Sequence, residues 1–256
     1  MKKNLSVYKI VFAMITMTGI FLLLITLVLS KLESRESEII YQASQQQLEQ
    51  EAKALISISN RPLGQIAWDY TYWDEFVAAI NRNDQKWFKD NITTILTSFR
   101  LEYVCVYDAN LNIIHEASSD EISVRRIIPP QVFSKFKDTS LIDFSIKTTE
   151  GIFEVTGSSV HPTDDPSHNR TESSGYLFVA KNLNEDFINE LSSLSGTQIR
   201  LSAPEDNTDE NDKNNVNSVI SLNGWDDQAV ARIIFTEKDE ALAVYRKDSA
   251  YMIIFL

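Results

Sequence analysis

The sequence opens with a long apolar segment. No charged residue occurs between Ile10 and Leu29, and thirteen of these 20 positions are Ile, Leu, Phe or Val. A helix of that length spans about 30 Å, the thickness of the hydrocarbon core of a bilayer. Three lysines precede the segment, so the positive-inside rule places residues 1–9 in the cytoplasm and the chain after Ser30 outside. We therefore predict a transmembrane helix over residues 10–29.

Two alternatives to an anchor are a cleaved signal peptide and a buried globular helix. The segment Leu27–Leu32 lacks a small-residue cleavage site, which disfavours cleavage. A second apolar segment, residues 250–256, follows three polar residues at 246–248. It is too short to cross a bilayer, which takes about 20 residues. We expect it to be the truncated start of a second transmembrane helix, and the last turns of a globular helix are the alternative.

Helical spacing of apolar positions continues after the membrane segment. Residues 32–59 combine this spacing with a Gln- and Glu-rich face, which predicts a long membrane-proximal helix. That helix either pairs with a second copy of itself or packs on its own domain. Pro62 is expected to interrupt it, because proline removes a helical hydrogen bond. A second helix is then predicted over Leu63–Ile80, with apolar or aromatic residues on two faces and therefore well buried.

The pattern changes to short strands from residue 102. Strands are expected at residues 102–107, 111–117, 141–147, 151–160, 175–181, 198–201, 218–222 and 230–235, and short helices at 129–137 and 182–194. The first two strands form a hairpin around Asp108-Ala109-Asn110. Polar residues at 161–174 and 203–217 predict surface loops. The order of elements predicts an α+β domain, with a mostly antiparallel sheet that helices cover on one side.

Composition excludes several functions. The net charge is −12, and no basic stripe is present, which argues against nucleic-acid binding. Cys105 is the only cysteine and lies in an apolar run, so it is expected to be a buried small hydrophobe. His161 and His168 share a loop with Asp164 and Asp165, but their spacing fits no recognised zinc pattern. Phosphate-loop and hydrolase motifs are missing from the sequence, and we expect no cofactor, metal or catalytic residue.

Residues 69–76 read Asp-Tyr-Thr-Tyr-Trp-Asp-Glu-Phe. This segment resembles the Asp-x-x-x-Trp-Asp signature of the fourth class of CHASE domains, which are extracellular sensor modules attached to histidine kinases and nucleotide cyclases. The resemblance extends over about residues 60–200 and includes the Gly175-Tyr176-Leu177 strand opening. It departs from the family at Asn110-Leu111, where such sensors often carry glycine. The resemblance implies a PAS-like or Cache-like sheet, a dimer and two flanking membrane helices.

The candidate site is this motif with its aromatic neighbours, Trp68, Asp69, Tyr70, Trp73 and Asp74. On one continuous helix the two carboxylates point about 140° apart, so they cannot form a close acid/base pair. Our hypothesis is that they hydrogen-bond either nearby backbone or a polar ligand beside Trp73. The aromatic residues either form a cage for a cation or pack in the core.

The resemblance and the topology together predict a sensor. Residues 30–249 form the extracytoplasmic part, on the periplasmic or extracellular side of the cell (inner) membrane. A small ligand or cue shifts the membrane helices. Expected partners are the lipid bilayer, an unknown small molecule and a second copy of the chain. The chain is not expected to be an enzyme, and a kinase or diguanylate cyclase output module would lie outside it. Alternatives are a self-contained anchored adaptor and an exported hydrolase.

Overall fold

The computed structural model describes residues 2–120, 122–206 and 215–238. The chain divides into two compact units. One contains Met1–Leu48, Glu210–Asn217 and Thr236–Leu256, and the other contains Glu49–Asp209 and Ser218–Phe235. The predicted second membrane helix at residues 250–256 lies outside the described residues, as does part of the acidic loop predicted at 203–217.

Helix α1 (Lys2–Tyr70) carries the apolar segment. Its most apolar stretch has a mean hydropathy of 2.6 and buries none of its side chains within the protein. Among the described residues, α1 is the one helix long and apolar enough to cross a membrane, judged by length and composition. The hydroxyls of Thr16, Thr18 and Thr26 each donate to the carbonyl four residues earlier, so these polar groups are satisfied within the helix.

The prediction that Pro62 separates two helices is wrong. Helix α1 continues through Pro62 to Tyr70, and α2 (Asp74–Arg82) begins after a short break. Pro62 is exposed, whereas Leu63 and Ala67 just beyond it are buried. Proline removes its own amide donor and its ring crowds the carbonyl four residues earlier, and burial of the residues that follow offsets this cost. The helical stripe predicted over Leu63–Ile80 is therefore divided between two helices.

Short helices follow the break. They are α3 (Gln85–Phe88), the π-helical η1 (Lys89–Thr93) and α4 (Thr94–Phe99), and later the 3₁₀ helix η2 (Pro130–Lys137) and α5 (Glu185–Ser195). The predicted helices at 129–137 and 182–194 are confirmed. Asn184 caps the start of α5, where its side chain accepts a hydrogen bond from the Phe187 amide, and Gly196 caps its end in a left-handed conformation.

Five antiparallel strands form the main sheet. They are β1 (Tyr103–Asp108), β2 (Ile113–Ser118), β3 (Leu141–Thr148), β4 (Gly151–Val160) and β5 (Gly175–Asn182), in the order β2-β1-β5-β4-β3. The predicted hairpin of the first two strands is confirmed. A smaller sheet has the order β6-β8-β7, with β6 (Gln198–Ser202), β7 (Asn215–Asn223) and β8 (Ala229–Lys238). Strand β7 begins inside the segment predicted to be an acidic loop.

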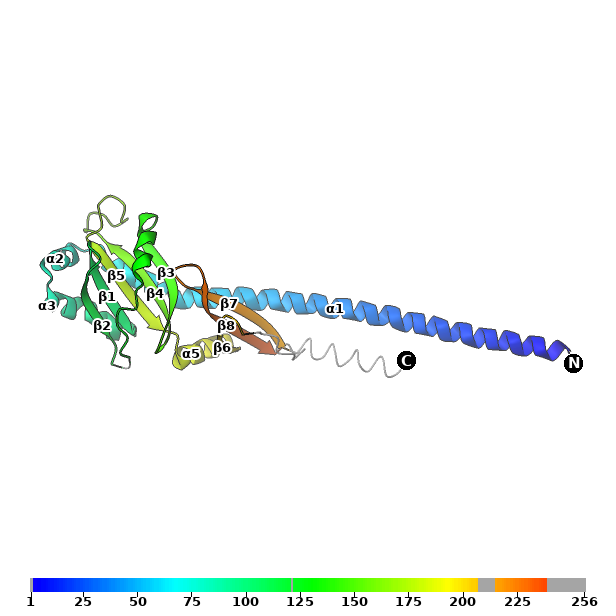
Figure 1. Ribbon diagram of the computed structural model, residues 1–256. Coiled ribbons are helices and arrows are strands. Elements are labelled where there is room, and N and C mark those ends of the chain that lie inside the picture. The colour runs from blue at the N-terminus through cyan, green and yellow to red at the C-terminus, as the bar shows by residue number, and fades with distance from the viewer. Residues whose placement is uncertain (1, 121, 207–214, 239–256) are drawn as a thin grey trace. The chain divides into compact units, whose positions relative to one another are not determined.

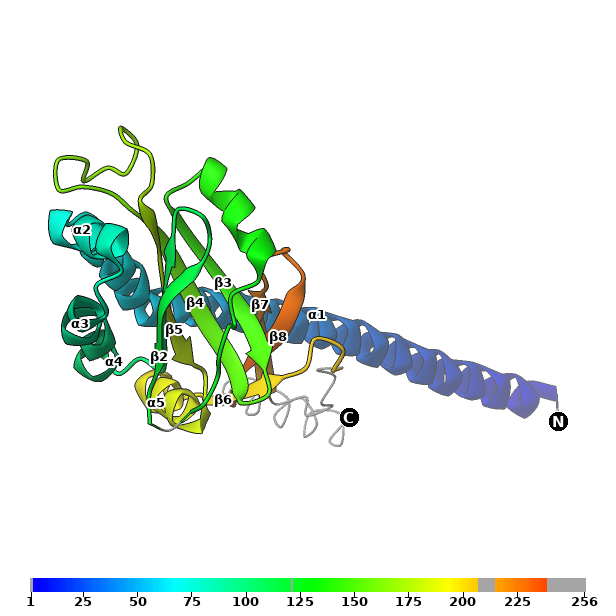
Figure 2. The same ribbon diagram turned by 60° about the vertical axis from the view of Figure 1, so that its left-hand side comes forward.

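Both faces of the main sheet are covered, and not one face as predicted. Val104 and Val106 of β1, with Leu177 of β5, face a core shared with the end of α1 and with α2 to α4. Alternate residues such as Cys105 and Phe178 face a second core, which includes Val132 of η2. Figures 1 and 2 show α2, α3 and α4 on one side of the sheet and η2 on the other. Cys105 is buried, as predicted.

Candidate functional site

Thr71 forms the break between α1 and α2. Its amide donates to the carbonyl of Trp68 at 3.1 Å, and its hydroxyl donates to the carbonyl of Ala67 at 2.8 Å. The same hydroxyl lies 2.9 Å from the hydroxyl of Ser158 on β4. Thr71 and Ser158 are both fully buried. Thr71 is thus bonded both to the last turn of α1 and to β4, and α1 ends at Tyr70, immediately before it.

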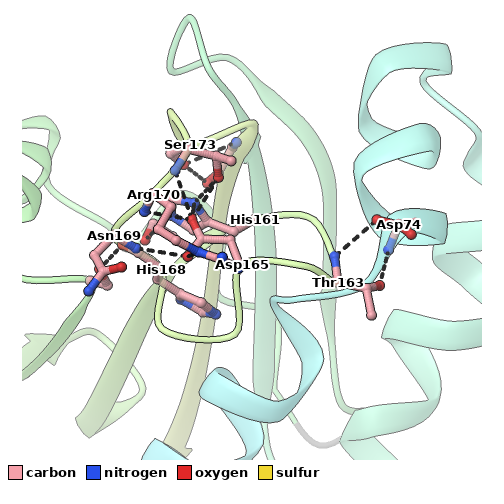
Figure 3. A network of polar contacts seen from close by, with 12 residues as sticks. Asp74, His161, Thr163, Asp165, His168, Asn169, Arg170 and Ser173 are labelled. Carbon is pink, nitrogen blue, oxygen red and sulfur yellow. Dashed lines mark hydrogen bonds and ion pairs between the residues drawn. The ribbon is translucent and has the colours of Figure 1, made fainter.

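The loop between β4 and β5, residues 161–174, folds onto this break. The amide of His161 donates to the Thr71 carbonyl at 2.7 Å. Asp74 and Thr163 exchange two further bonds, which Figure 3 shows: the Thr163 amide donates to Asp74 Oδ1 at 2.9 Å, and the Asp74 amide donates to Thr163 Oγ1 at 3.1 Å. Asp74 is the first residue of α2, where a negative charge also suits the positive end of the helix.

Asp165 organises the interior of the loop. Its side chain is fully buried and accepts hydrogen bonds from the amides of Asn169, Arg170 and Thr171 and from the Thr171 hydroxyl (Figure 3). Burial alone would raise the pKa of Asp165, but these bonds outweigh it and hold the pKa well below its ordinary value. Asp165 is therefore a charged, hydrogen-bonded group inside the protein.

Three aromatic rings stack on one another, and one of them, that of His161, contacts this carboxylate. His168 lies between Trp68, with ring centroids 4.1 Å apart, and His161, with centroids 4.8 Å apart. The ring nitrogens of His161 contact the hydroxyls of Thr171 and Ser159, each at 2.9 Å, and its Nδ1 lies 3.4 Å from Asp165. His168 is 4 % exposed, and neither of its ring nitrogens has a hydrogen-bond partner in the part of the chain that the structure describes.

Burial lowers the pKa of both histidines. For His168 the pKa falls to about 4, since burial and the neighbouring His161 disfavour the protonated form more than Asp165 favours it. For His161 burial also lowers the pKa, although Asp165 opposes the change. The sequence predicted residues 161–174 to be an exposed polar loop. That is wrong for its three buried members, His161, Asp165 and His168, which we call the histidine cluster.

The residues predicted from the motif lie in separate places. Asp69 is exposed and makes no hydrogen bond or ion pair within the described residues, whereas Asp74 bonds Thr163. The two aspartates are on different helices, so the orientation derived for a single helix does not apply. Trp68 stacks on His168, while Tyr70 and Trp73 pack together at 4.7 Å beside the helical core. Their role in ligand binding stays a prediction.

Metal binding finds no support in the geometry. Within residues 2–120, 122–206 and 215–238, no group of three or more His, Cys, Asp or Glu side chains is arranged to hold a metal ion. His161 and His168 lie ring over ring at 26°. Imidazole lone pairs lie in the ring plane, so two stacked rings direct them side by side and not toward a common point.

Polar residues line the part of the sheet next to this site. Ser158, Thr156 and Glu154 of β4 alternate with the apolar residues that face η2. Across the β3–β4 pair, Ser145 donates to Glu154 at 2.8 Å and Thr156 donates to Asp143 at 2.5 Å. Burial raises the pKa of Glu154, and nearby Asp143 raises it further, against the hydrogen bond from Ser145.

Sequence reasoning missed Thr71, Ser158 and the histidine cluster. Thr71 stands inside the Asp-x-x-x-Trp-Asp motif, which is the signal that points to it, although threonine also occurs within the unbroken apolar part of α1. Two histidines and an aspartate within one short loop are a second signal. Neither signal identifies its distant partner, because Ser158 lies 87 positions from Thr71 in the chain.

The architecture is that of an α+β sensor domain: a long helix leads into an antiparallel sheet. The periplasmic domain of Vibrio cholerae LuxQ has a similar fold, with a TM-score of 0.50 and 11% identity over 76% of this chain and 98% of that one. The CHASE4 domain model matches residues 55–202. The chain therefore belongs to the CHASE4 family of extracellular sensor domains.

Two further structures are similar at lower scores. The sensory domain of the Campylobacter jejuni chemoreceptor Tlp3 with isoleucine bound has a TM-score of 0.46 and 10% identity, over 81% of this chain and 97% of that chain. The ligand-binding domain of Mlp24 with asparagine has a TM-score of 0.44 and 11% identity, over 83% and 98%. No curated protein sequence matches the chain.

Proposed function

We propose that this CHASE4 sensor domain is held at the inner membrane by residues 10–29, lies on the periplasmic side and relays a small-molecule signal through α1. The observation that supports this most directly is the course of α1. One unbroken helix connects the apolar segment to Thr71, where the family motif lies. A ligand that favours one arrangement at the helix break would shift the population of helix positions at the membrane.

The output is proposed to reside in a module outside this chain, and the chain itself to carry no catalysis. A ligand supplies coupling only through its different affinity for the two states, typically about 1–3 kcal/mol. The ligand is proposed to be small, and nothing in the described geometry favours a particular chemical class. The rival functions, an anchored adaptor and an exported hydrolase, gain no specific support from the site.

The membrane topology can be tested with single cysteines. Cys105 is buried, so a Cys105→Ala background provides a chain without other thiols. In that background, Ser98→Cys in α4 is expected to react with a membrane-impermeant maleimide on intact spheroplasts. Lys9→Cys is the matched control and is expected to react only after the membrane is permeabilised. Labelling of Lys9→Cys and not of Ser98→Cys on intact spheroplasts would reverse the topology and end the sensing proposal.

The proposed dimer is supported by exposed apolar residues on α1. Leu32 and Ile39 are 51% and 65% exposed and are seven residues apart, so they lie on one face of the helix. In the same background, Ile39→Cys is expected to form a disulfide between two copies in the membrane. Ser34→Cys lies about 140° around the helix and is expected to cross-link far less. Equal or absent cross-linking at the two positions would contradict a dimer through this face.

A further inference from the structure

The histidine cluster combines features that a stable loop does not need. His168 is buried between two rings, and both of its nitrogens lack partners within the described residues. Burying polar atoms without partners destabilises the folded state, so such groups are uncommon in folded proteins. A phenylalanine would fill the same stack without that cost. What imidazole adds to the stack is the ability to take up a proton near neutral pH.

We propose that protonation of His168 releases the loop 161–174 from the end of α1. In the closed state, the neutral ring packs flat against Trp68 at an interplanar angle of 11°. A protonated ring would carry a positive charge and two N–H donors into a buried place where neither nitrogen has an acceptor among the described residues. The loop then favours an open arrangement in which His168 reaches solvent. The signalling consequence rests on the proposed function, but the opening itself does not.

The groups around His168 explain why the charged form is not accommodated. His161 stacks on one face and would be repelled by a second positive charge. Tyr72 lies 6.3 Å away, and Trp68 covers the other face, where its attraction for a cation is a partial compensation. Asp165 favours the charge, but its oxygens are already engaged by loop amides, Thr171 and His161, and Arg170 lies 3.7 Å from it.

The direction of the pH effect follows from the lowered pKa. The ordinary pKa of histidine is 6.5, and that of His168 in the closed state is about 4. The open state therefore binds more protons between these two values. The closed form has its full stability above pH 6.5. As the pH falls from 6.5 toward 4, the ratio of closed to open chains falls by up to about tenfold for each pH unit. His161, whose pKa is also lowered, acts in the same direction.

Release of the loop would reach the helix break directly. The loop is attached to the break through the His161 amide on the Thr71 carbonyl, through the Asp74–Thr163 pair and through the Trp68–His168 stack. All of these attachments lie within residues 68–74 on the helical side. Opening of the loop would leave the Thr71 carbonyl without this donor and would free the start of α2. A proton is thus a candidate signal that acts on the helix break, which carries the family motif.

The test is hydrogen exchange of the full chain in lipid nanodiscs, measured by mass spectrometry at several pH values and corrected for intrinsic exchange rates. Peptides that cover residues 161–174 are expected to exchange faster at pH 4.5 than at pH 7, by on the order of 50-fold. His168→Phe keeps an aromatic ring in the stack and takes up no proton there, so most of the pH dependence of loop exchange is expected to be lost, with only the part due to His161 remaining. His115→Phe is the matched control, because His115 also stacks on an aromatic ring, that of Phe88, and bonds Thr93 outside the loop. In this variant the loop 161–174 is expected to respond to pH as in the wild type.

Retention of the full pH response in His168→Phe would overturn the proposal, and so would a wild-type loop whose exchange does not change with pH. A second measurement does not depend on the variant folding well. The Cε1 signals of the three histidines in the wild-type chain can be followed by NMR as a function of pH. A midpoint for His168 well below 6.5 supports the proposal, and a midpoint at or above 6.5 contradicts it. Neither readout depends on membrane orientation, so failure here is distinct from failure of the topology test.

Discussion

The surface of the sheet that faces α1 and α2 has two halves with different chemistry. On β1 and β5, the residues that point to the helices are valines and leucines, including Val104, Val106 and Leu177. On β3 and β4, the same face presents Ser145, Thr156 and Ser158, all buried. One surface thus changes from an apolar half to a polar half within the width of two strands.

This difference indicates which contacts are suited to change. Burial of apolar surface contributes about 25 cal/mol per Å² and depends little on direction, so it holds helices in place without defining one arrangement sharply. Hydrogen bonds contribute about 1 kcal/mol each but require specific geometry, and they can be exchanged for bonds to water. The helix break attaches to the polar half through Thr71 and Ser158, and the loop 161–174 attaches to the break. The part of the site proposed to move is therefore held by the more replaceable contacts.

The largest effect is expected in the apolar half. Leu177→Ala should lower the free energy of unfolding by about 3 kcal/mol, because the side chain is fully buried and its removal leaves a cavity. Chemical unfolding of the full chain in detergent micelles measures this loss. Leu194→Ala removes the same atoms from a leucine that is 69% exposed, and it should change stability by less than about 0.5 kcal/mol. Similar losses for the two variants would contradict the assigned core.

A smaller effect is expected in the polar half. Thr71→Val should cost about 2 kcal/mol, because it removes the hydroxyl bonded to Ala67 and Ser158 and leaves the buried Ser158 hydroxyl unpaired. The double variant with Ser158→Ala should cost less than the sum of the two single variants, since the second change removes the unpaired group. Strict additivity in this double-mutant cycle would show that the two hydroxyls do not interact.

The Asp74–Thr163 pair should contribute less again. Asp74→Ala is expected to cost about 1 kcal/mol and to speed exchange of the Thr163 amide, because it removes both the acceptor and the charge at the start of α2. Asp74→Asn keeps an acceptor oxygen and should cost only about 0.3 kcal/mol. Thermal unfolding compares the two variants directly. Equal losses would mean that the charge, and not the hydrogen bond, is what matters.

Asp69 should have the smallest effect. Its side chain is exposed, so Asp69→Asn is expected to change stability by less than about 0.5 kcal/mol. This variant separates the two aspartates of the motif, one bonded to the loop and the other without a hydrogen bond or ion pair within the described residues. A loss as large as that of Asp74→Ala would show a structural role that the geometry does not reveal. Unchanged stability with a lost signalling response would instead point to ligand contact at Asp69.

Most strands were predictable because their signals are local. The β-branched and aromatic residues in Gly151–Val160 and the turn before this segment indicate β4 without reference to any distant residue. The end of α1 was not predictable in this way. Its periodic residues continue past Tyr70, and the helix stops where Thr71 meets Ser158 and His161, which are far along the chain. Local propensity also overestimated the tendency of Pro62 to end the helix, because burial of the next turn outweighs the missing hydrogen bond.

The histidine cluster was missed for a related reason. Asp165 and the two histidines are polar residues in a proline-containing loop, and aspartate is rarely buried without partners. The partners here are mostly amides of the loop itself, which become available only once residues 169–171 adopt the turn around Asp165. The amino-acid composition of the loop does not predict such a turn. The aromatic residues of the motif were identified from the sequence, but their division between the loop and the core depends on tertiary packing.

The pairing of β1 with β5 also affects how the chain assembles. Tyr103 lies opposite Ala180, so the centre of the sheet cannot form until a long intervening segment has been synthesised. Until then, β1 and the apolar sides of α2 to α4 have no cover from β5, and contacts between distant parts of a chain form slowly. For a chain that crosses a membrane as it is made, this interval is when misfolding and degradation compete with folding.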